Sequence, residues 1–95
     1  MLLAALTIVI TACDGADAVA GVITEVDASS VVEWESIVVE TQDGERLTFL
    51  PGDAVDLRFW SASHLREHML SGHPVEVTYE SREGALVATE IDDAS

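Results

Sequence analysis

Three histidines in the second half of the chain have spacings that could hold a metal ion. His64 and His68 are four residues apart, so a helix would place their side chains on neighbouring turns of one face, and His73 follows five residues later. Imidazoles at this spacing can share one zinc or copper ion. In the alternative interpretation they belong to a solvated helix face, where histidine near the C-terminus gains from the helix dipole. Zinc or copper is the one cofactor that the sequence suggests.

Residues 64–68 read His-Leu-Arg-Glu-His and so resemble the H-x-x-E-H motif of the inverted zincins. In that family the two histidines hold zinc and the glutamate, here Glu67, activates water. A protease also needs a third ligand on a distant element and a substrate cleft, for which so small a domain has little room. The sequence contains no phosphate-binding glycine loop and no second cysteine. We therefore predict that the protein is not an enzyme and has no catalytic residues.

The two tryptophans are the aromatic residues that say most about a binding surface. Trp34 lies between two glutamates, and Trp60 follows an alternating segment in which Leu57 and Phe59 are expected to point inward. Alternation would then turn Trp60 outward. Exposed tryptophans often mark the binding site for a sugar, peptide or protein partner. The alternative is that each tryptophan covers the open end of a small barrel.

The charge of the chain excludes several classes of partner. Its 95 residues include 18 acidic and 4 basic side chains, a formal charge of −14. All the basic residues are arginines, namely Arg46, Arg58, Arg66 and Arg82. Nucleic acid and anionic lipid both require a cationic patch, which four dispersed arginines cannot form. An acidic surface instead favours cationic partners or metal ions.

The N-terminal segment has the character of a secretory signal. Residues 1–12 carry no charge and are almost entirely apolar, but they are too few to span a bilayer. Ile10-Thr11-Ala12-Cys13 resembles the lipobox of bacterial lipoproteins. The resemblance implies that residues 1–12 are a removed signal peptide and that Cys13 carries the lipid, whose acyl chains hold the protein in the membrane. The alternative is a buried N-terminal strand or helix with an inert cysteine.

The remaining chain reads as a short tether, residues 13–18, followed by alternating strands over residues 19–27, 31–41 and 45–50. Gly21 indicates a bend or bulge in the first strand, and a change of phase near Glu35 indicates a bulge in the second. Asp43-Gly44 predicts a hairpin turn. Residues 55–60 are expected to be a short strand or an extended loop.

A helix is predicted over residues 61–71, because Ala62, Leu65 and Met69 share one face. Ser61 or Ser63 would cap its start, and Gly72 would end it. By this assignment the histidines His64 and His68 face solvent. Strands over residues 75–80 and 85–91 follow, with a turn at residues 82–84 and a frayed tail at residues 93–95.

Three strands, a helix and two strands are the element order of a five-stranded Greek-key barrel of the OB type. The sequence thus predicts a mainly β protein, with an OB-like barrel over residues 19–92 and one helix between its third and fourth strands. With the lipobox, this gives a membrane-anchored lipoprotein on the outer side of the cytoplasmic membrane. We expect a non-enzymatic binding or adaptor domain with an envelope protein or glycan as partner, and metal binding as the alternative function.

Overall fold

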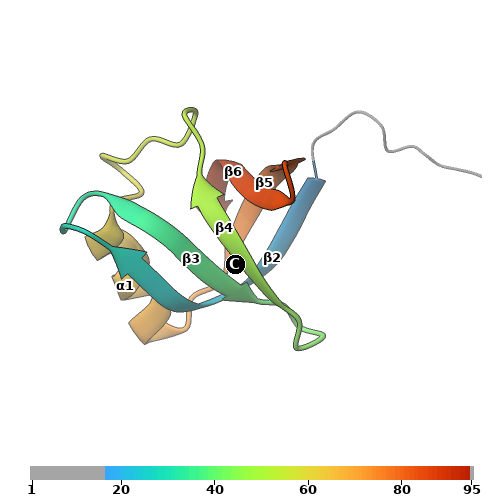
Figure 1. Cartoon of the computed structure of the whole chain (residues 1–95). Helices are drawn as coiled ribbons and strands as arrows, with labels where there is room; N and C mark the ends of the chain where they lie inside the picture. The colour runs from blue at the N-terminus through green and yellow to red at the C-terminus, as the bar shows by residue number, and fades with distance from the viewer. Residues whose placement is uncertain (1–16, 95) are drawn as a thin grey trace, which may run out of the picture.

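A computed structural model describes residues 17–94 as five strands closed into a barrel and one helix (Figure 1). The elements in chain order are β2 (Asp17–Ala28), β3 (Trp34–Glu40), β4 (Arg46–Pro51), α1 (Ala62–Ser71), β5 (Val75–Arg82) and β6 (Ala85–Asp93). Around the barrel the strands follow the order β2-β3-β4-β6-β5. All neighbouring strands are antiparallel except β4 and β6, which are parallel. The predicted five-stranded OB-like barrel, with its helix between the third and fourth strands, is confirmed.

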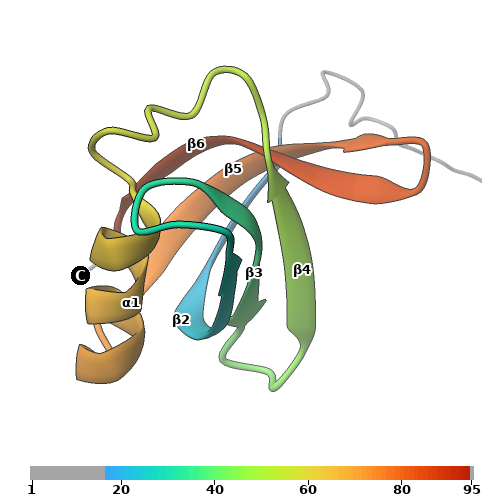
Figure 2. The same ribbon diagram turned by 60° about the vertical axis from the view of Figure 1, so that its left-hand side comes forward.

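The helix lies at the end of the barrel where β5 begins and β6 ends, and it packs against β2 (Figure 2). Ser61 caps the helix through a hydrogen bond from the His64 backbone N–H to its hydroxyl oxygen, and Gly72 ends it in the left-handed conformation with φ of 77°. The sequence predicts both the cap, at Ser61 or Ser63, and the helix end at Gly72. The part of the chain that the structure describes contains no helix long and apolar enough to cross a membrane.

Strand β2 bends at Gly21, where it changes partners. Residues 17–21 pair with β5, whereas residues 22–28 pair with β3. At this crossing a Cβ atom on Gly21 would lie 2.4 Å from the carbonyl oxygen of Glu40 and 2.8 Å from a methyl carbon of Val39. Gly21 is therefore required because β3 approaches the β2 backbone too closely for any side chain.

Three register shifts curve the sheet so that it can close. Strand β3 carries an extra residue at Glu35, because Asp27 pairs with Ser36 and Ala28 pairs with Trp34. This is the bulge that the change of phase predicted. A second shift lies between Ile23 and Glu25 of β2, where β2 pairs with β3. A third lies between Thr78 and Tyr79 of β5, where β5 pairs with β6.

Several element boundaries differ from the prediction. Residues 31–33 form a loop rather than the start of a strand. The carbonyl oxygens of Val31 and Val32 accept hydrogen bonds from the first two backbone N–H groups of α1 and so are not available to a neighbouring strand. The barrel begins at Asp17, inside the predicted tether, since Asp17 pairs with Tyr79 of β5. The predicted tail is also ordered to residue 94, because Asp93 is the last residue of β6 and Ala94 donates to the Pro74 carbonyl.

The barrel interior is filled by apolar side chains, most of them aliphatic, from every strand and from the helix. The fully buried ones of greatest volume are Phe49, Ile23, Ile37, Leu65, Val39, Val75 and Val77. Leu65 comes from the helix, and the others come from inward-facing positions of their strands, which alternate along a barrel strand. The buried cluster includes Trp34 and Trp60 near the start of the helix, and Val19 of β2 is among the partly buried side chains that pack against it.

Candidate functional site

Both tryptophans are buried, so the expectation that Trp60 is exposed on the surface is wrong. Trp34 is 2% exposed and Trp60 is 7% exposed. The indole Nε1–H of Trp34 donates to the backbone carbonyl of Trp60 at 2.9 Å, which fastens the segment before α1 to the start of β3. The tryptophans thus complete the core at this end of the barrel, as the alternative interpretation stated. Neither offers a ring to a ligand on the surface.

The outward aromatic residue is instead Phe59, which is 59% exposed. Phe59 is exposed and Trp60 is buried, the reverse of the prediction, because residues 53–60 form turns in which the two-residue alternation of a strand does not apply. The backbone N–H of Trp60 donates to the Asp56 carbonyl within these turns, and the indole ring of Trp60 is buried. Phe59 packs edge-on against Trp60 and His64 with ring centroids 5.2 and 5.0 Å apart.

The histidines do not lie on a solvated helix face as predicted. His64 is half-buried and stacks on the Trp60 ring, with centroids 4.6 Å apart and planes 3° from parallel. His68 is buried, because the helix turns toward the barrel the face that carries Ala62, Leu65 and His68. His73 is exposed beyond the helix end. The cluster is therefore mainly a packing element between helix and barrel.

Three of the six ring nitrogens of this cluster lie close to oxygen atoms of the protein. The Nδ1–H of His64 donates to the Phe59 carbonyl at 2.7 Å. In His68, Nδ1 lies 3.4 Å from the His73 carbonyl oxygen and Nε2 lies 3.3 Å from Oδ1 of Asp93. Both partners are acceptors, so a neutral His68 ring donates to one of them and faces the other, and both nitrogens are directed to these oxygens rather than to an ion shared with the rings of His64 and His73. Within residues 17–94 no three His, Cys, Asp or Glu side chains gather in a way that could hold a metal.

Glu67, the general base that the inverted-zincin motif would supply, is exposed on the helix. The histidine ring beside it in the sequence, His68, turns to Asp93 rather than toward a shared site. Cys13, the predicted site of lipid attachment, lies outside the described residues.

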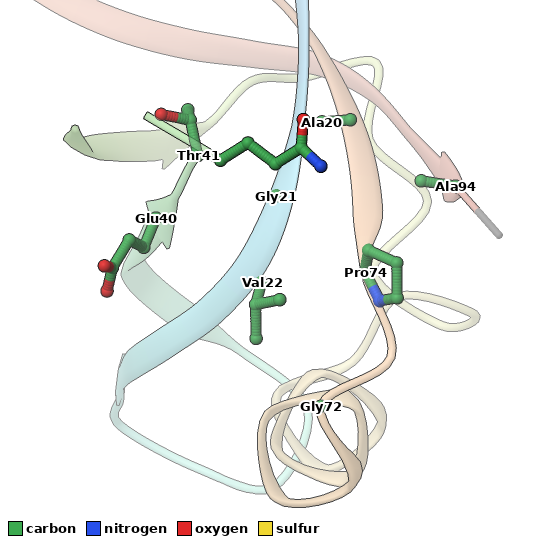
Figure 3. A pocket seen from close by; sticks show the side chains of 9 residues that line it. Ala20, Gly21, Val22, Glu40, Thr41, Gly72, Pro74 and Ala94 are labelled. Carbon is green, nitrogen blue, oxygen red and sulfur yellow. The ribbon is translucent and has the colours of Figure 1, made fainter. Parts of the chain in front are cut away.

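An open groove lies at the bend of β2. Its volume is about 530 Å³. It is lined by residues 20–22 of β2, residues 40–42 at the end of β3, and Gly72, Pro74 and Ala94. In Figure 3 Glu40 and Thr41 lie on one side of β2, Pro74 and Ala94 on the other, and Gly72 at the foot. Four segments far apart in the sequence thus meet here, which is why sequence patterns did not reveal the groove.

The groove lies in acidic surroundings. Glu40 is on its wall, with its carboxylate turned away from β2 (Figure 3) and 3.5 Å from Nε of Arg46. Glu76 of β5 pairs with Ala20 of β2 on one side. On its other side Glu76 is directly opposite Asp92 of β6. Two carboxylates in such a pair repel one another, and a cationic partner would relieve this cost. The groove can thus bind a neutral or basic ligand by shape, by hydrogen bonds and by charge.

Comparison with protein-family models, with curated proteins and with solved structures gave no match to this chain.

Proposed function

We propose that this chain is a membrane-anchored envelope lipoprotein whose barrel is a non-enzymatic binding or adaptor domain. The observation that carries the proposal is the division of the chain into an apolar leader with a lipobox and a barrel that closes within residues 17–93. The strands that close the barrel, and the buried side chains described for its core, all come from residues after the lipobox. This supports the interpretation of residues 1–12 as a signal peptide and of Cys13 as the lipidated residue.

The barrel would stand close to the membrane. Asp17, the first residue of β2, comes four positions after Cys13, which is at most about 14 Å of extended chain. Gly21 and the groove follow four positions further along the same strand. A lipid on Cys13 would therefore present the groove to other components of the envelope near the membrane surface, on the extracytoplasmic face.

The groove supports a binding role better than the histidines support metal binding. It is open, it has backbone and small side chains on its walls, and it adjoins uncompensated carboxylates. The ring nitrogens of His68, by contrast, already lie close to oxygen atoms of the protein. The partner would be an envelope protein or glycan that carries neutral or positive groups.

Two measurements in living cells test the proposal. A palmitate analogue should label the wild type and not Cys13→Ser; equal labelling of both, or of neither, would refute the anchor. For the binding role, a photo-reactive amino acid at Gln42 in the groove should cross-link to a discrete partner. The same group at Ala54, an exposed loop residue outside the groove, is the matched control. Identical products from both positions would refute binding at the groove.

A further inference from the structure

One edge of strand β2 is open over its first four residues, residues 17–20, because at Gly21 the backbone of β3 already lies against the strand. Residues 17–21 pair with β5 on one side. On the other side β3 ends at Glu40, opposite Val22, and the chain turns away through Thr41. Among the described residues no strand therefore pairs with this edge of residues 17–20. Every second residue along it presents its backbone N–H and C=O to an incoming strand.

This edge lacks the features that usually protect a strand from pairing with other chains. Its sequence is Asp-Ala-Val-Ala, with no proline, no lysine and a single charge at its outer end. The outward side chains are the small ones, since Ala18 and Ala20 are exposed and Val19 packs against the core. Along residues 17–20 a second strand would thus meet no bulky outward side chain of β2. The groove lies at the inner end of the edge and offers space for side chains of that strand.

The charge around the edge selects the kind of strand that fits. Asp17 lies on the edge itself, and the Glu76–Asp92 pair lies on the neighbouring strands. No arginine is among the described residues that line the groove, and Arg46, which lies outside it, is paired with Glu40 of the groove wall. A second copy of this chain would bring another net charge of −14 to the contact, which disfavours pairing of the protein with itself. A segment with lysine or arginine at alternate positions would be attracted.

We propose that the open edge of β2, with the adjoining groove, binds an extended basic segment of another protein by adding it to the barrel as a strand. Backbone hydrogen bonds would supply the affinity, and the groove and the carboxylates would supply the preference for basic sequences. The inference rests on the proposed binding role of the barrel and names its ligand class.

The test uses the full-length protein in detergent micelles and a synthetic peptide of alternating lysine and valine, long enough to span residues 17–20. The peptide should bind, and hydrogen exchange of backbone amides should slow in residues 17–20 as it does so. An analogue that is N-methylated at alternate residues keeps the charge but loses the edge hydrogen bonds. It should bind about tenfold more weakly, as expected for the loss of one or two bonds at about 1 kcal/mol each.

Matched variants locate the site. Ala20→Lys places a cation on the edge and should weaken binding about tenfold or more, whereas Ala54→Lys makes the same change in a distant exposed loop and should alter it little. Ala18→Lys provides a second edge variant if Ala20→Lys does not fold. Equal binding of the methylated peptide, equal effects of the two lysine positions, or protection elsewhere would overturn the proposal. So would self-association through the same edge without peptide. If these occur while a partner still cross-links to Gln42, strand addition fails and the proposed binding role stands.

Discussion

The substitution Trp34→Phe tests whether the two tryptophans are buried in the core and not exposed on the surface. The indole N–H of Trp34 donates to the Trp60 carbonyl, in a buried position. Phenylalanine cannot donate, so the carbonyl would lose this partner at a cost of about 1–3 kcal/mol. The smaller ring also leaves roughly 40 Å³ empty, which costs about 1 kcal/mol at about 24 cal/mol per Å³.

The expected loss in the free energy of unfolding is therefore about 2–4 kcal/mol. A domain of this size has about 4–12 kcal/mol in all, so Trp34→Phe should fold with a Tm lowered by roughly 10–30 °C. Urea and thermal unfolding followed by circular dichroism would measure both quantities. Trp60→Phe is the matched control: it removes similar ring volume and keeps the carbonyl, so it should cost about 1 kcal/mol. Equal, near-zero losses in both variants would refute the buried hydrogen bond and restore the surface interpretation.

Three further predictions concern other elements that build the site. Gly21→Ala should cost about 1–3 kcal/mol of stability, because its Cβ would meet the Glu40 carbonyl at 2.4 Å; a neutral result in urea unfolding would contradict the close strand crossing. Ser61→Ala should remove about 0.5–2 kcal/mol with the helix cap, with Ser61→Asp as the variant that restores it. Zinc added to the wild type should leave its Tm unchanged, because no three metal-ligating side chains gather within residues 17–94; a zinc-dependent rise that His68→Gln abolishes would reinstate the metal site.

Local sequence patterns were sufficient to predict most of the fold. The left-handed conformations of Gly44 and Gly72, with φ of 89° and 77°, lie where the hairpin and the helix end were predicted. In the turn between β5 and β6, Glu83 and Gly84 both have positive φ, as a tight hairpin turn requires. Such positions are set by the conformational preferences of one or two residues, so the sequence shows them directly.

The errors arose where distant segments decide the outcome. Val31 and Val32 have strand-forming side chains, but their carbonyls are taken by backbone N–H groups near the start of α1, thirty residues away. His68 appeared polar and outward-facing, yet Asp93 at the end of β6 and the Trp60 ring cover it. Both outcomes depend on which elements meet in the folded barrel. The open edge of β2 was hidden for the same reason, since it follows from where β3 ends.

The central claim is that this barrel is held to a membrane by a lipid on Cys13, and detergent phase partitioning tests it most directly. The full-length protein would be expressed in its own host and compared with Cys13→Ser. The account predicts that the wild type enters the detergent phase, without residues 1–12, and that the variant stays in the aqueous phase. If both stay aqueous with residues 1–12 intact, the protein is not a lipoprotein and its N-terminal segment must serve another role.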